Sequence, residues 1–404
     1  MAPRNARRAL ASLAVAVPLG LAGAAALAGD GAPAGSEQAI AEKLQDEDAA
    51  VEASVRAASE RLRPSIVEVE EIGAMPEKVE TPAKDDQGSG GSAEGVIAKK
   101  GFKQAFGPST GVAVAKDLVV TSTFAVKREP RHIFVTRHDG KAFVATPLGR
   151  DEGRMILLLR VEGADLTPAP VAARDAIKVG RYAISLGRGL GTQEPALSLG
   201  IVSAVDRIGG RAIQTSGKVS PANYGGPLAT IDGEVMGVLV PLTAFGGMAG
   251  VDLYDSGIGF AVPLQDVKEL LPRLEKGEKL KPGFLGVAVD QARTEDGVLV
   301  EGVQPGSAAE KAGIKAKDVI VEIDGKPVQA YFQLHHALGR GLAGDKVKLV
   351  VERNGKKKTL EVTLGEVPEQ PPPGTPPRMP PPPGPGPGPG PGPNPPDQPK
   401  DDPQ

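Results

Sequence analysis

The middle of the chain is a series of short apolar runs separated by turn signals, and this pattern restricts the fold more than any other feature. Between residues 111 and 262 the runs include LVVTS, RYAISLG and EVMGVLVPL. Regular spacing of this kind, without helical periods between the runs, is typical of an all-β barrel or sandwich. Residues 283–366 hold a second group of such runs with one helical segment near 329–339, which predicts a separate α+β unit.

The first 28 residues have the parts of an export signal. Three arginines precede an Ala-rich apolar run, and the run ends in Ala-Leu-Ala, a pattern that signal peptidase cleaves. We therefore expect cleavage after Ala28 and an exported protein of the periplasm or cell envelope. The alternative is an uncleaved membrane anchor, which Pro18 and the many small residues disfavour.

Two helices and two low-complexity segments are predicted around the β-rich units. Residues 37–63 carry apolar side chains at approximately helical spacing, and residues 263–276 place four apolar side chains on one helical face. Residues 73–106 are polar and without period, which predicts a long surface loop. The Pro/Gly-rich tail, 368–404, is expected to be disordered with polyproline II character, either as a spacer or as a PxxP ligand.

The composition excludes several classes of site. The chain has no Cys, so disulfides, thiolate catalysis and cysteine zinc ligands are excluded. Its net charge is −3 and no basic face is concentrated, which argues against a nucleic-acid partner. No His, Asp or Glu cluster has zinc or calcium spacing, and no helix follows the Gly-rich segment 187–191, so we expect no cofactor.

Five short motifs follow one another between residues 200 and 263. They are GIVSA, IQT, GGPL, GEVMGV and GIGFAVP. Their order resembles the second barrel of trypsin-like serine proteases of the HtrA/DegP type, and GFLGV at 283–287 resembles the start of that family's PDZ domain. The resemblance covers about residues 60–366 and implies a fold dominated by β-structure: two six-stranded antiparallel barrels, a connecting helix and a PDZ domain.

The resemblance and the segment boundaries together predict six regions. They are a signal peptide (1–28), a linker and helix (29–63), a trypsin-like double β-barrel (64–264), a connecting helix and linker (265–282), a PDZ domain (283–367) and a disordered tail (368–404).

The three positions that resemble the family's catalytic triad hold no triad residue. Phe124 stands where the motif has its His, Met155 where it has its Asp, and Tyr224 where it has its Ser. Ala222 replaces a Gly whose main-chain N–H helps to bind the oxyanion. Phe cannot accept a proton and Met cannot orient an imidazole, so we expect no catalytic residue at these positions.

Relocated catalytic groups are the alternative to an inactive site. Ser122, Thr123 and Ser220 flank the degenerate positions, and a Ser–Lys dyad would involve Lys218. The four histidines, at positions 132, 138, 335 and 336, have no Ser/His/Asp spacing and are expected on the surface.

A PDZ domain binds an extended C-terminal peptide as an added strand and holds the peptide carboxylate on main-chain N–H groups. The resemblance assigns the carboxylate loop to Phe284, Leu285, Gly286 and Val287. It assigns the opposite wall to the helix of Leu334 and Leu338. The alternative is that the apolar members of this set only form the core.

The sequence thus predicts a non-catalytic scaffold, chaperone or regulator of protein quality control. Its expected partners are C-terminal or unfolded peptide segments of envelope proteins, and copies of itself or active proteases in an oligomer. A serine endopeptidase with relocated residues and a structural envelope protein are the alternatives. Active relatives form trimers through aromatic residues near the N-terminus, but residues 30–72 contain no Phe, Tyr or Trp.

Overall fold

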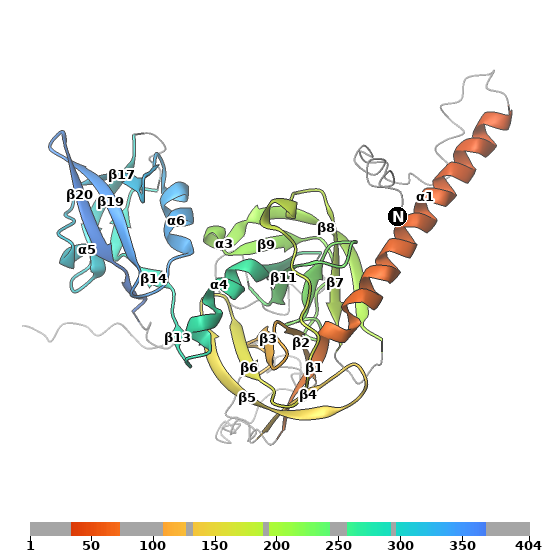
Figure 1. Ribbon diagram of the computed structural model, residues 1–404. Helices are drawn as coiled ribbons and strands as arrows, with labels where there is room; N and C mark the ends of the chain where they lie inside the picture. Colours follow the sequence, from red (N-terminus) through yellow and green to blue (C-terminus); the bar gives the residue numbers. More distant parts are fainter. Residues whose placement is uncertain are drawn as a thin grey trace, which may run out of the picture. The chain divides into compact units, whose positions relative to one another are not determined.

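A computed structural model describes residues 34–72, 108–126, 132–188, 194–242, 257–291 and 296–368 (Figure 1). The predicted signal peptide, the predicted loop 73–106 and the predicted tail beyond residue 368 lie outside the described residues. Among the helices that are described, none has the length and apolar character needed to cross a membrane.

The first barrel is built from six antiparallel strands. They are β1 (Ile66–Ile72), β2 (Ser109–Ala113), β3 (Leu118–Ser122), β4 (His132–Thr136), β5 (Ala142–Asp151) and β6 (Ile156–Arg160). They follow the order β5-β4-β1-β2-β3-β6, and pairing between β5 and β6 closes the barrel. Ile133 and Val135 are buried while His132 is exposed, as expected for a strand with one face on a core.

The second barrel is closed in the order β10-β11-β12-β9-β8-β7. Its strands are β7 (Tyr182–Gly187), β8 (Ala196–Asp206), β9 (Ala212–Thr215), β10 (Pro227–Ala229), β11 (Val235–Val240) and β12 (Gly259–Pro263). Ala183, Val202, Ile213, Leu228 and Ala261 come from five of these strands and pack in one buried cluster that fills the barrel. The predicted pair of six-stranded barrels is therefore confirmed.

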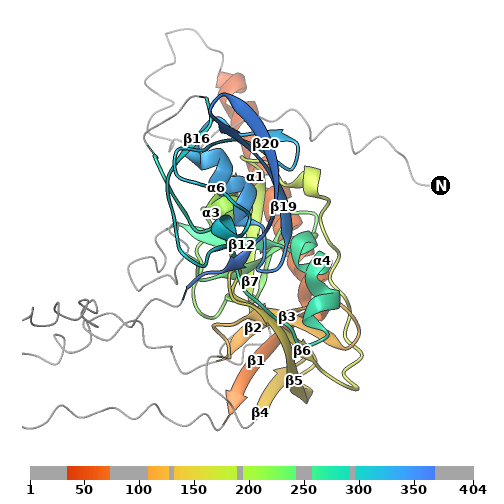
Figure 2. The ribbon, with the colours of Figure 1, turned by 90° about the vertical axis from the view of Figure 1, so that its left-hand side faces the viewer.

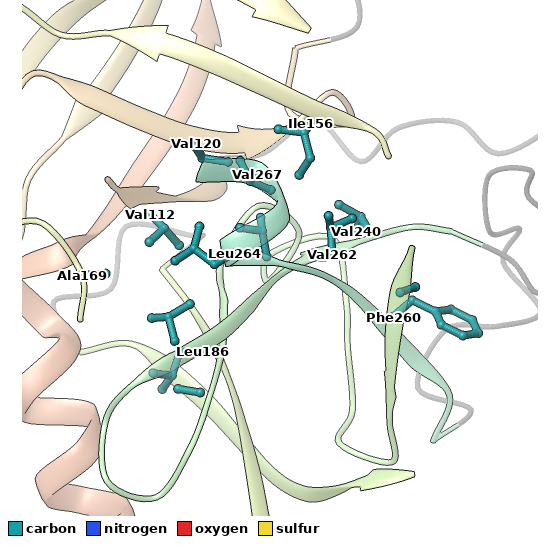
Figure 3. Packing of buried hydrophobic residues seen from close by; sticks show 14 of the residues in the cluster. Val112, Val120, Ile156, Ala169, Leu186, Val240, Phe260, Val262, Leu264 and Val267 are labelled. Atoms are coloured by element: carbon teal, nitrogen blue, oxygen red, sulfur yellow. The ribbon is translucent and has the colours of Figure 1, made fainter. Parts of the chain in front are cut away.

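A second apolar cluster joins the two barrels. This cluster takes residues from both barrels and from the helix α4 (Leu264–Leu274), as Figure 3 shows. It includes Val120 and Ile156 of the first barrel, Val262 of the second and Val267 of α4. The short elements η3 (Arg63–Ser65), η4 (Arg174–Ala176) and α3 (Arg207–Gly210) lie between the longer ones.

The segment after α4 contains a strand that the sequence did not predict. β13 (Lys279–Leu280) pairs in parallel with Arg150 and Asp151 at the end of β5, so the sheet of the first barrel has seven strands. The sequence predicts a linker here, because two residues are too few to show an alternating pattern.

The helix α1 (Ala34–Leu62) coincides closely with the predicted helix 37–63. Its last turns pack on the barrels, where Val55, Ala58 and Leu62 are buried. Arg61 Nη1 donates a hydrogen bond of 2.7 Å to the carbonyl of Asp232 in the turn before β11. Between Glu42 and Ala50 almost every side chain is exposed.

The PDZ unit has its own sheet and its own core (Figure 2). The sheet runs β15 (Val287–Val289), β16 (Val298–Val303), β17 (Val319–Ile323), β19 (Lys346–Arg353) and β20 (Lys356–Thr363), and β18 (Lys326–Pro327) pairs with β17. β14 (Gly283–Phe284) pairs with β21 (Gly365–Glu366), and the helices are α5 (Ala308–Lys311) and α6 (Tyr331–Gly339).

Candidate functional site

Phe124 and Tyr224, at two of the degenerate triad positions, are in contact between the two barrels, and the turn of Met155 lies beside that of Phe124. Phe124 lies in the turn that follows β3, and Met155 in the turn that precedes β6. These strands are paired, with Ser122 opposite Ile156, and the N–H of Thr123 donates a hydrogen bond of 2.8 Å to the carbonyl of Met155. The two turns are therefore held side by side at one end of the first barrel.

Tyr224 comes from the second barrel, in the turn before β10. The rings of Phe124 and Tyr224 meet edge to face, with 5.1 Å between their centroids and 72° between their planes. Ser109 Oγ and the N–H of Thr110 donate to the carbonyl of Tyr224, at 2.6 and 3.1 Å, and so attach this turn to β2 of the first barrel. Two aromatic rings thus occupy the place where a base and a nucleophile would meet.

The phenol of Tyr224 is not an activated nucleophile. Its side chain is buried, and burial raises the pKa of the hydroxyl to about 12. Within the described part of the chain no hydrogen-bond partner reaches this hydroxyl. The phenol is therefore neutral at neutral pH, and no base is in position to take its proton.

One of the two main-chain donors expected for an oxyanion hole is engaged within the turn around Tyr224. An oxyanion hole of this fold uses the N–H at the nucleophile position and the N–H two residues earlier. Here the N–H of Tyr224 donates to the carbonyl of Pro221 at 3.3 Å. Thr110 Oγ1 donates to the carbonyl of Ala222 at 2.6 Å, which orients the peptide group between Ala222 and Asn223.

The residues considered as relocated nucleophiles are engaged elsewhere. Ser122 is fully buried and its Oγ accepts a hydrogen bond from the N–H of Phe124 at 3.2 Å. Ser220 Oγ donates to Asn223 Oδ1 at 2.8 Å. Lys218 is exposed. Thr123 lies in the turn after β3, and its N–H donates the hydrogen bond to the carbonyl of Met155. None of these contacts pairs a hydroxyl with a base.

A small cavity beside Tyr224 has no signature in the sequence. Its volume is about 10 Å³, room for about one water molecule, and Val219, Tyr224, Val240, Leu242 and Phe260 are among its lining residues. These residues come from three separate segments, so no local motif could identify them.

The four histidines stand apart from this site. His132 is exposed on β4 and His138 follows that strand, where burial lowers the pKa of its imidazole. His335 and His336 lie on α6 of the PDZ unit. In the described residues no three side chains of the His, Asp and Glu kind gather as a metal site would require.

The predicted carboxylate loop of the PDZ unit presents two main-chain N–H groups that a ligand could use. The carbonyls of Leu285 and Gly286 accept hydrogen bonds from Ala309 and Gln304, both at 2.9 Å. The amides of Leu285 and Gly286 donate to no main-chain carbonyl among the described residues. Gly286 has φ +82°, and a Cβ there would lie 2.3 Å from Cβ of Ser307. This turn therefore requires glycine.

The other predicted groove residues differ in burial. Leu285 and Leu334 are buried in the PDZ core, whereas Val287 and Leu338 are partly exposed against it, and Phe284 lies on β14. β15 forms the edge of its sheet, because β16 is its one neighbour among the described strands. An edge strand beside a helix is the geometry to which a peptide strand adds.

Comparison with known proteins agrees with both halves of this architecture. Residues 109–238 match the family of trypsin-like peptidase domains, and residues 283–364 match the PDZ domain. The chain is similar to proteins of the HtrA family. The periplasmic pH-dependent serine endoprotease DegQ of Escherichia coli is 33% identical over 277 residues, which are 64% of this chain and 59% of that protein.

Other HtrA relatives give the same picture. The periplasmic serine endoprotease DegP of Salmonella typhimurium is 32% identical over 69% of this chain and 60% of its own length. A probable periplasmic DegP-like endoprotease of Chlamydia muridarum is 31% identical over 65% of this chain and 54% of its own. The chain thus spans little more than half the length of the curated relatives that it matches.

Solved structures show the fold. The HtrA-type protease AlgW with a tripeptide superposes with a TM-score of 0.58 at 22% identity, over 78% of this chain and 97% of that one. The serine endoprotease from Yersinia pestis superposes with a TM-score of 0.54 at 20% identity, over 78% and 98% of the two chains.

Proposed function

We propose that this chain is a catalytically inactive HtrA-type protein of the periplasm or cell envelope. It binds C-terminal or unfolded peptide segments through its PDZ domain and acts as a scaffold, a chaperone-like factor or a regulator of active proteases. The periplasmic names of its relatives and its N-terminal export pattern support the location.

The contact between Phe124 and Tyr224 carries this proposal. Acyl transfer needs a nucleophile, a base that takes its proton and a group that orients the base. Loss of one such group costs roughly 10⁴-fold to 10⁶-fold in kcat. Here a phenyl ring stands for the base, a buried phenol for the nucleophile and a thioether for the orienting carboxylate, so all three chemical roles are missing.

Peptide binding rests on different residues. The amides of Leu285 and Gly286 point to no main-chain acceptor, β15 is an edge strand, and α6 provides an apolar wall with Leu338. A carboxylate on these amides and a strand along β15 would satisfy hydrogen-bonding groups that the described chain leaves unpaired.

Labelling with a fluorophosphonate probe and cleavage of unfolded casein test the inactivity. We expect no labelling and no cleavage from the purified mature protein, with an active relative such as DegQ as the positive control. Labelling that disappears in Ser220→Ala or Ser122→Ala would instead establish a relocated nucleophile.

A further inference from the structure

A buried arginine at the junction of the two barrels has no partner for its charge. Arg188 directly follows the end of β7, and only 4% of the residue is exposed. Its Nε and Nη1 atoms are buried and take part in no hydrogen bond. The guanidinium also forms no ion pair with any side chain in the part of the chain that the structure describes. Arginines are almost never fully buried unless they are paired, so this group needs a physical explanation.

The main chain holds Arg188 in place through contacts with both barrels. Its N–H donates a hydrogen bond of 2.7 Å to Thr110 Oγ1 on β2, and that hydroxyl donates in turn to the carbonyl of Ala222 at 2.6 Å. The preceding residue, Gly187, lies so close to Asn223 that a Cβ would be 2.6 Å from the Nδ2 atom. A shift of the main chain that exposed the Arg188 side chain would break these contacts.

The carboxylates around Arg188 are already engaged with other groups. Burial lowers the pKa of this guanidinium, the negative charge of Glu68 opposes that effect, and the positive charge of Arg63 adds to it. Glu68 has another interaction of its own, while Glu194 and Asp139 are paired with other arginines at 3.5 and 2.5 Å. Arginine does not lose its proton in proteins, so the buried positive charge persists. A negative group bound here would offset much of the free energy that its burial costs.

His138 provides a second unpaired polar atom in the same region. Its Nδ1 atom is buried and takes part in no hydrogen bond. Burial lowers the pKa of the imidazole, and the positive charges of Arg63 and Arg188 lower it further, so the three groups lie within electrostatic reach of one another. His138 is half-buried and the Arg63 side chain is 35% exposed. The edge of this region therefore meets solvent, from which a small ion can arrive.

We propose that Arg188 anchors a binding site for a small oxyanion, with Arg63 and His138 at its edge. Guanidinium N–H groups form charge-assisted hydrogen bonds with carboxylates and with phosphate, because both present the negative oxygen atoms that these donors need. The anion is either a free ion or the carboxylate side chain of a bound polypeptide. The site requires neither a PDZ ligand nor the residues at the triad positions, so it goes beyond the proposed function.

Differential scanning calorimetry of the mature full-length chain tests the site, with inorganic phosphate and acetate as probes. In about 20 mM of either anion we expect the barrel midpoint to rise by at least about 2 °C relative to chloride at equal pH and ionic strength, because an anion that binds the folded state stabilises it. Arg188→Met should lose this rise. In chloride its midpoint should be no lower than that of the wild type, since an apolar side chain of similar length replaces an unpaired buried charge.

Arg154→Met is the matched control, because Arg154 is also 4% exposed but forms an ion pair of 2.8 Å with Asp151. This change should lower the barrel midpoint, since it leaves Asp151 without its partner, and the rise in phosphate should remain. Arg188→Lys retains a positive charge with fewer donors, and isothermal titration calorimetry should show at least about 3-fold weaker phosphate binding. This second variant tests the site even if Arg188→Met does not fold.

An aspartate with both termini blocked distinguishes the two sources of the anion. Binding of phosphate and acetate without the blocked aspartate identifies a free ion, whereas binding of all three identifies a carboxylate of a polypeptide. Equal midpoints of the wild type in phosphate, acetate and chloride would overturn the proposal. A phosphate response of Arg188→Met as large as that of the wild type would overturn it as well, because it would show a general effect of the salt.

Discussion

At the scale of single residues, the turn around Tyr224 retains the glycine that the meeting of the two barrels requires. Gly225 has φ +85°, and a Cβ there would lie 2.0 Å from the carbonyl oxygen of Thr110. The N–H of Gly225 donates to the carbonyl of Leu239 at 2.8 Å. The close approach of the two barrels therefore demands glycine at 225, whereas position 224 tolerates a ring that packs on Phe124.

This arrangement predicts a graded response to restoring the triad. Tyr224→Ser alone should give no measurable casein cleavage, because no base is present to take the proton. Adding Phe124→His supplies a base, and adding Met155→Asp supplies its orienting group, a step of about 10⁴-fold in kcat. Ala222→Gly as a fourth change should add a further clear gain, since one oxyanion donor contributes about 10²-fold to 10³-fold.

The matched series carries Tyr224→Ala in place of Tyr224→Ser, because it leaves the same space and lacks the hydroxyl. Only the serine series should gain fluorophosphonate labelling. Full activity from Tyr224→Ser by itself would show that Phe124 and Met155 do not occupy the base and orienting positions.

The sequence could identify these residues but not their contacts. The motif around Gly225-Gly226-Pro227 is local, so it located Tyr224 without knowledge of the fold. The edge-to-face contact with Phe124 and the bond from the N–H of Tyr224 to Pro221 depend on how two barrels meet. Neither has a signature in the sequence.

At the scale of elements, the loop from β14 to β15 determines whether the PDZ unit can take a carboxylate. Gly286→Ala should weaken binding of a peptide with an apolar C-terminal residue by at least about 10-fold. The new Cβ meets Ser307, and the residue has a left-handed φ, so the loop must shift. Isothermal titration calorimetry with free-acid and amidated forms of one peptide measures this effect.

Gly306→Ala is the control for the same region, because φ is +75° there but a Cβ meets nothing within 4 Å. It should retain most of the affinity. Equal affinity of the wild type for acid and amide peptides would contradict carboxylate binding on the amides of Leu285 and Gly286.

Element prediction succeeded where the pattern was long and failed where pairing was distant. The alternation in strands such as β4 and the periodicity of α1 are visible over several residues, and both were predicted. β13 has two residues, and its partners Arg150 and Asp151 lie far away in the sequence. Such a strand forms because the edge of an existing sheet offers hydrogen-bonding groups to it. The local sequence of the strand does not indicate this pairing.

At the scale of the whole molecule, the PDZ unit has a core of its own, although Leu342 belongs to the cluster that joins the barrels. Sixteen buried residues between Leu285 and Leu364 form one cluster, while the barrels hold their own. A core of that kind supports folding as a unit. Two cooperative unfolding transitions are therefore expected, one for the barrels and one for the PDZ unit.

A substitution at Asp318 should change the unfolding midpoint of the PDZ unit and leave that of the barrels unchanged. It is fully buried and accepts hydrogen bonds from Arg353 Nε and Nη2 at 2.6 and 2.8 Å, and from the N–H of Lys315 at 2.8 Å. Burial by itself raises the pKa of this carboxyl, but the bonds from Arg353 and Lys315 and their positive charges outweigh burial and hold the pKa below its usual value.

Asp318→Asn should lower the stability of the PDZ unit by about 3 kcal/mol, because it removes the charge that balances Arg353. In differential scanning calorimetry this change lowers the PDZ midpoint by more than about 10 °C and leaves the barrel midpoint in place. Since the folded-state pKa of Asp318 is depressed, its contribution is complete above about pH 4 and is lost as the pH falls through the folded-state pKa. The difference between wild type and Asp318→Asn should therefore narrow in acid. A single transition that moves as a whole in Asp318→Asn would show that the two cores unfold together.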